Sequence, residues 1–183
     1  MFKSRSGLKF IKYLGQNRKM AKKFEFGLEK LKKDYARLQK KYKLPPFKIL
    51  NEEFEIERAS ERETETLLRE IRKAMTEKAI TVLRFLEMML NPANAPLFMF
   101  SVIKKLSPGN RRLMEEIYSK LSDFEISAIK LDLSYDEKKE ASFIKEGTKK
   151  WLEMKDNLER LGDALETAWR ESEEEAGKKE YVG

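Results

Sequence analysis

Residues 60–90 read SERETETLLREIRKAMTEKAITVLRFLEMML, and apolar side chains recur in this stretch every three or four positions. The stripe consists of Leu68, Ile71, Met75, Ala79, Val82, Leu86 and Met89, and it is widened by Leu67, Leu83, Phe85 and Leu90. A stripe this wide is typical of an amphipathic helix packed inside a bundle. Ser60 and Glu63 have the spacing of a capping box, so we expect the helix to begin there.

The same spacing predicts three more helices after this one, over residues 97–106, 108–131 and 134–170. Ser107 before Pro108 is a favoured helix start, and Ser134 with Glu137 forms a second capping box. No stretch has the alternation of a strand, and short connections favour antiparallel neighbours. The sequence therefore predicts an all-α protein, an antiparallel four-helix bundle preceded by a long basic N-terminal helical arm.

The predicted arm, residues 1–44, contains a heptad seam that starts at Ala21. The seam, which a second copy of the chain could also cover, continues through Phe24, Leu28, Leu31, Tyr35, Leu38 and Tyr42. We expect the helix to stop near Lys43, because Pro45 and Pro46 push the residues before them into extended geometry.

The other predicted divisions follow from these helices. Residues 45–59 are expected to be a Pro-containing linker, and residues 60–170 the helical bundle. Residues 171–183 lack periodicity and are expected to form an acidic, then mixed-charge, flexible tail. Met- and Phe-rich residues 88–100 are interpreted as closing the core, with a partner groove as the alternative.

Charge is distributed very unevenly along the chain. Residues 1–50 carry 16 Lys or Arg and three acidic residues, whereas residues 51–183 carry 23 basic and 29 acidic residues. The overall charge of +7 thus hides a strongly cationic arm on a mildly acidic body. Like charges three or four positions apart on a helix repel each other, which indicates that the arm binds a polyanion.

Nucleic acid is the polyanion that this pattern favours, because each Lys or Arg near a phosphate releases counterions. The predicted phosphate contacts are Lys3, Arg5, Lys9, Lys12, Arg18, Lys19, Lys22, Lys23, Lys30, Lys33, Arg37 and Lys40. Phe10 and Tyr13 could stack on bases, although packing is the alternative for both. The expected partner is therefore RNA, a ribonucleoprotein or coated DNA, bound through its backbone.

Three other roles stay open from the sequence. The arm could simply be the solvated outer face of a docked helix. It could lie on an anionic membrane surface, but the apolar part of GLKFIKYLG spans barely two turns. It could also belong to a helical adaptor that forms a homo-oligomer, with the arm of one subunit against the acidic residues of another.

Enzymatic chemistry has little support in the composition. The chain has no His and no Cys, which removes the commonest general base, thiolate nucleophiles and most zinc sites. No glycine-rich phosphate loop occurs, and the carboxylate pairs fit solvated helix faces. We expect a non-enzymatic, cytoplasmic protein without catalytic residues, metal or cofactor. Abundant Lys, Arg and Glu with only two Gln resembles the bias of heat-adapted proteins.

Overall fold

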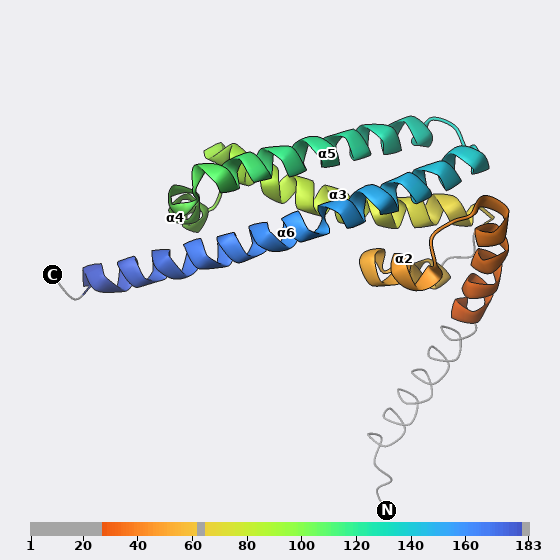
Figure 1. The fold of residues 1–183 in the computed structure, drawn as a ribbon, viewed down its shortest axis with the longest axis horizontal. Helices are drawn as coiled ribbons and strands as arrows, with labels where there is room; N and C mark the ends of the chain where they lie inside the picture. Colours follow the sequence, from red (N-terminus) through yellow and green to blue (C-terminus); the bar gives the residue numbers. More distant parts are fainter. Residues whose placement is uncertain (1–26, 62–64, 181–183) are drawn as a thin grey trace, which may run out of the picture.

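The computed structural model describes residues 27–61 and 65–180, and every regular element in these ranges is a helix (Figure 1). The elements in chain order are a helix over 27–42, α2 (Phe47–Phe54), the 3-10 helix η1 (Ile56–Glu61), α3 (Leu67–Leu90), the 3-10 helix η2 (Pro92–Asn94), α4 (Leu97–Lys105), α5 (Pro108–Asp132) and α6 (Glu137–Glu180). The all-α prediction is confirmed for this part of the chain.

The three long helices α3, α5 and α6 pack against one another, and α5 runs antiparallel to the other two (Figure 1). Their apolar faces meet in one core, to which α4 contributes by packing against α6. The predicted antiparallel four-helix bundle is not confirmed, because α4 has only nine residues and α3 and α6 run in the same direction (Figure 1). Among the described helices, none is both long enough and apolar enough to cross a lipid bilayer.

The stripe of α3 is buried as its spacing predicts, through Leu68, Ile71, Met75, Ala79, Leu86 and Met89. Leu83 is buried in place of Val82, which is only half-buried. The helix begins at Leu67 rather than at Ser60, after a 3-10 helix, and residues 62–64 lie outside the described ranges.

The two later helix starts differ in how well the sequence predicts them. Ser107 caps α5 as expected, since its hydroxyl accepts a hydrogen bond from the Asn110 amide. The capping box at Ser134 is wrong: the Asp136 carboxylate accepts from the amides of Lys138 and Lys139, at 2.9 and 3.1 Å. A carboxylate at the cap also interacts favourably with the positive end of the helix dipole.

Residues 45–59, expected to be a linker, form α2 and most of η1 and contribute to the core. Leu50 and Ile56 are fully buried, and the Phe54 ring lies 5.3 Å from the Trp151 ring of α6. The Glu53 carboxylate accepts hydrogen bonds from the Trp151 indole at 3.0 Å and from Lys155 at 2.6 Å. Burial alone would raise the pKa of Glu53, but these two hydrogen bonds outweigh it and lower that pKa.

Residues 171–180, expected to belong to a flexible tail, continue α6 as helix, and 181–183 lie outside the described ranges. A helix of 44 residues is about 66 Å long, and Figure 1 shows α6 running past α4 toward the C-terminus. Lys105 of α4 forms an ion pair with Glu175, which ties this end of α6 to the body.

Gly147 lies within α6 without interrupting it. A Cβ atom at this position would stand 2.6 Å from the Phe124 ring of α5. Phe124 itself is buried and packs on Phe143, with 4.6 Å between the ring centroids. The absence of a side chain at this glycine therefore permits a close approach of α5 and α6.

Candidate nucleic-acid interface

Helix 27–42 is held against the chain's own core by the predicted heptad seam. Leu31 and Tyr35 are buried, and Leu38 and Tyr42 pack partly buried against the core. The Tyr35 hydroxyl donates to the Pro45 carbonyl at 2.5 Å, and its ring contacts Phe47 edge-on. Burial raises the pKa of Tyr35. Within one chain, this part of the seam is therefore occupied without a second copy.

The end of helix 27–42 is fixed at Lys43, as the two prolines after it predict. Lys43 has a left-handed backbone, with φ of 55°, and the Leu44 amide donates to the Gln39 carbonyl at 3.2 Å. This reversal resembles a Schellman motif, in which an apolar residue after the turn packs back on the protein. Leu44 is buried accordingly, so the turn sets the direction of the helix.

A polar contact joins helix 27–42 to the start of α6. Lys41 and Tyr42 both donate to the Glu137 carboxylate, at 2.9 and 2.6 Å. The Tyr42 hydrogen bond first, and then the Lys41 hydrogen bond, lower the pKa of Glu137. Interactions with Tyr42 first, and then with Glu137, raise the pKa of Lys41.

Acidification is expected to weaken this contact. Because the pKa of Glu137 is lower in the folded chain than in the unfolded one, its stabilisation is present above the unfolded value and is lost as the pH falls through the folded value. Urea unfolding of the wild type and of Glu137→Gln from neutral to acidic pH measures this. We expect a small advantage of the wild type at neutral pH that disappears in acid. A difference independent of pH would contradict the assignment.

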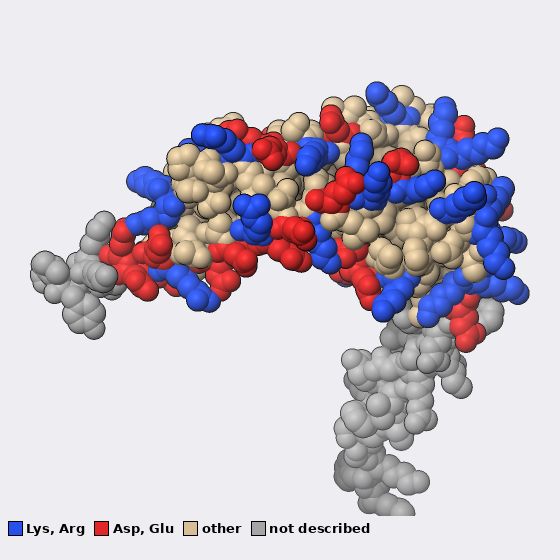
Figure 2. Space-filling view, viewed as in Figure 1, with Lys and Arg blue, Asp and Glu red and all other residues tan. Residues whose placement is uncertain are grey.

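The outward face of helix 27–42 is cationic. Lys30, Lys33, Arg37 and Lys40 are all exposed and follow one another at spacings of three and four, on the side opposite the seam. Arg37 pairs with Asp34 at 3.0 Å. The three lysines have no ion-pair partner among the residues that the structure describes. Figure 2 shows basic side chains gathered over this helix.

Four of the twelve predicted phosphate contacts are brought together on this face. The stacking candidates Phe10 and Tyr13 and the seam residue Phe24 lie outside the described residues. So do the remaining eight predicted phosphate contacts, which are Lys3, Arg5, Lys9, Lys12, Arg18, Lys19, Lys22 and Lys23. Sequence reasoning missed Lys32 and Lys43, which are also exposed, and Lys32 lies 5.9 Å from the centre of the Phe47 ring. Lys32 lies beside the seam, next to Leu31, and Lys43 lies in the turn after the helix ends, so neither belongs to the row opposite the seam.

A shallow pocket of about 360 Å³ lies between helix 27–42 and the starts of α3 and α6. Its charged lining consists of Asp34, Arg37, Lys41, Glu65 and Glu137. Three carboxylates therefore face two cations, and these groups are already paired in part with one another. This lining does not suit a phosphate, so the exposed face of the helix is the better anion surface.

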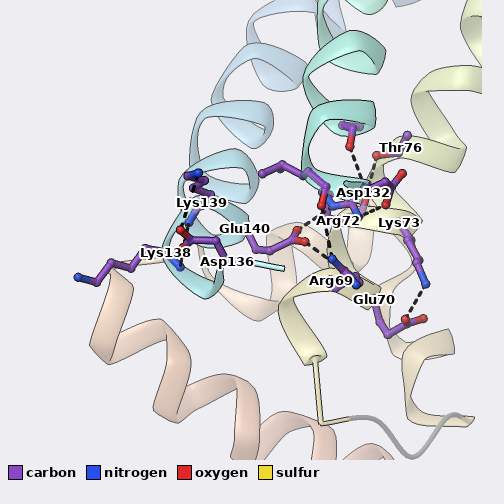
Figure 3. Close-up of polar contacts among 12 residues, drawn as sticks. Arg69, Glu70, Arg72, Lys73, Thr76, Asp132, Asp136, Lys138, Lys139 and Glu140 are labelled. Carbon is purple, nitrogen blue, oxygen red and sulfur yellow. Dashed lines mark hydrogen bonds and ion pairs between the residues drawn. The ribbon is translucent and has the colours of Figure 1, made fainter. Parts of the chain in front are cut away.

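The chain also contains a buried ionic network that joins α3, α5 and α6 (Figure 3). Arg72 of α3 and Glu140 of α6 are both essentially inaccessible to solvent, and Arg72 Nε donates to the carboxylate at 2.7 Å. The same guanidinium donates to Asp132 of α5 at 2.5 Å and to the Ala128 carbonyl at 3.5 Å. Arg69 adds a longer contact to Glu140, at 3.5 Å.

This network has the geometry of a structural clamp. Its charges are matched within the chain, and its central pair is closed to solvent. Sequence reasoning missed it, although a signal exists: Arg72 stands one turn after Leu68 on the apolar face of α3, and Glu140 stands one turn before Ile144 on that of α6. A charged residue at a core-facing position requires a buried partner.

No known protein family matches the chain, and no match to it was found among curated proteins or solved structures.

Proposed function

We propose that this is a non-enzymatic, cytoplasmic protein that binds the phosphate backbone of nucleic acid, as RNA, ribonucleoprotein or coated DNA, through its basic N-terminal arm, residues 1–44. In this proposal α3, α4, α5 and α6 serve as the four-helix scaffold that carries the arm. The single observation that supports it most is the row of exposed lysines Lys30, Lys33 and Lys40, without acidic partners among the described residues.

Lys30 and Lys33 stand three positions apart, and Arg37 stands one turn from both Lys33 and Lys40, so the row with Arg37 carries like charges one turn apart. Like charges one turn apart on a helix destabilise it by about 0.2–0.5 kcal/mol per pair, and opposite charges would stabilise it by a similar amount. A phosphate backbone removes the repulsion and gains entropy from released counterions. The helix is anchored by Tyr35 and by the Glu137 contact, so its cations are presented from a fixed support. Because the helix backbone is already fixed, little conformational entropy of that backbone is lost on binding.

The proposal predicts a salt-dependent affinity for RNA and DNA of arbitrary sequence. Replacing Lys30, Lys33 and Lys40 with Gln is expected to weaken binding and to reduce the slope of log affinity against log salt by about 1 per residue. Fluorescence anisotropy with labelled single-stranded RNA and duplex DNA, titrated at several salt concentrations, measures both quantities. Comparing the affinities for duplex DNA and for single-stranded RNA then distinguishes the candidate targets.

A matched control removes the same charge elsewhere. Lys104, Lys120 and Lys150 are exposed, have no ion pair among the described residues and lie on α4, α5 and α6. Their joint replacement by Gln is expected to leave most of the affinity and the slope intact. Equal losses in both triple variants would show a diffuse response to net charge, and no binding by the wild type at low salt would end the proposal.

A further inference from the structure

An exposed apolar patch lies where α4 packs on the end of α6. Leu97 is 86% exposed and Phe98 50%, and the Phe98 ring meets Trp169 of α6 edge-on at 5.6 Å. Trp169 and Phe100 are also exposed, at 38% and 37%. The Phe98–Trp169 contact joins the two helices, and Leu97 and Phe100 are further exposed apolar side chains on α4. Large exposed apolar side chains gathered in this way mark a protein contact.

The α6 side of this patch is acidic, whereas the last turn of α4 carries Lys104 and Lys105. Glu173 follows Trp169 by one turn of α6, and Glu171 and Glu174 lie further round the same helix. All three are exposed and have no ion-pair partner among the described residues, whereas Glu166 is paired with Arg170. A partner for this corner therefore needs positive charge and side chains able to cover aromatic rings.

The other end of the same molecule has these properties. Figure 2 shows acidic side chains along the C-terminal part of α6 and basic side chains over helix 27–42 at the opposite end. Lysine and arginine stems cover apolar surface while their charged groups stay in water. Their cationic groups also interact favourably with the faces of aromatic rings.

We propose that the chain self-associates head to tail, with the cationic face of helix 27–42 of one copy docked on the patch of Leu97, Phe98, Phe100 and Trp169 of the next. Opposite charges at Lys30, Lys33 and Lys40 on one copy and at Glu171, Glu173 and Glu174 on the other set the orientation. The two surfaces differ, so the contact is heterologous and builds a ring or an open chain of subunits. Nucleic acid on the same cationic face competes with it.

A charge exchange tests the docking. Variant A carries Lys30→Glu, Lys33→Glu and Lys40→Glu, and variant B carries Glu171→Lys, Glu173→Lys and Glu174→Lys. Each variant alone has like charges at both ends and is expected to associate about tenfold or more weakly than the wild type. An equimolar mixture of A and B is expected to associate again, because each supplies the charge that the other lacks. Sedimentation velocity at low salt measures all four samples, the wild type included.

The apolar part of the contact is tested separately. Leu97→Ser with Phe98→Ser is expected to weaken self-association, while Ile126→Ser on α5, at a residue 53% exposed, leaves it unchanged. A wild type that stays monomeric at high concentration, or a mixture of A and B that fails to associate, would overturn the proposal. The proposed function is tested separately, because variant B retains the lysines of helix 27–42 and should still bind RNA. Self-association is measured in the absence of RNA.

Discussion

Replacing Arg72 with methionine is expected to lower the free energy of unfolding by about 3–5 kcal/mol. Methionine fills much of the arginine stem volume, so the loss comes mainly from the carboxylate left behind. Glu140 is fully buried and, among the described residues, would retain only the 3.5 Å contact with Arg69. An unpaired charge in the interior costs far more than an exposed one. Urea unfolding followed by circular dichroism measures the change.

Two further variants make this prediction specific. Adding Glu140→Met to Arg72→Met removes the orphaned charge and is expected to recover most of the loss, since apolar replacement of a buried pair is often neutral. Lys73→Met removes the next basic residue, whose pair with Glu70 is half-exposed, and should change stability by no more than about 1 kcal/mol. A similar small effect at Arg72 would show that the network contributes little.

The network fixes how the three long helices meet. Leucine and methionine faces pack in several registers, because apolar contact has little directionality. The Arg72 guanidinium reaches Glu140 on α6 and Asp132 on α5 at the same time in only one of these registers. The clamp holds the N-terminal part of α6, where Glu137 contacts Lys41 and Tyr42. The register in which α3, α5 and α6 pack therefore also determines where the cationic face of helix 27–42 lies.

The helices themselves follow from the sequence because apolar spacing reports a buried face directly. The stripe through Leu68, Ile71 and Met75 is buried, and the turn at Lys43 lies where Pro45 and Pro46 predict it. Helix starts are weaker signals, since several side chains compete for the same free amides. At α6, Asp136 takes the role that the spacing of Ser134 and Glu137 suggests for serine.

The misses share another cause. Residues 45–59 begin with two prolines, which favour a linker, although Phe47, Leu50 and Phe54 recur at the helical steps of three and four. Leu50 and Ile56 have no exposed surface. Their burial depends on surfaces of α3 and α6 that are distant in sequence. Residues 171–180 are helical although no apolar stripe marks them, and the ion pair of Glu175 with Lys105 supplies the distant contact.

The candidate interface could be predicted in part. Helical geometry alone places Lys30, Lys33, Arg37 and Lys40 opposite the apolar seam, and the structure finds them there, exposed. Sequence spacing does not reveal which cations meet a carboxylate from another helix. Lys41, paired with Glu137 across 96 positions of sequence, is such a case. The distinction between paired and unpaired cations required the fold.

Leu50→Ala is expected to lower the free energy of unfolding by about 2–5 kcal/mol, because Leu50 is fully buried and its truncation leaves a cavity. A linker residue would tolerate the change, so this variant tests whether α2 belongs to the cooperative core. The matched control is Leu133→Ala, since Leu133 is 84% exposed and the same substitution there should change stability by no more than about 0.5 kcal/mol. Urea unfolding followed by tryptophan fluorescence has a direct reporter in Trp151, which lies against Phe54 of α2. Equal midpoints for the two variants would mean that α2 detaches from the bundle at little cost, and helix 27–42 would then lose the support that presents its lysines.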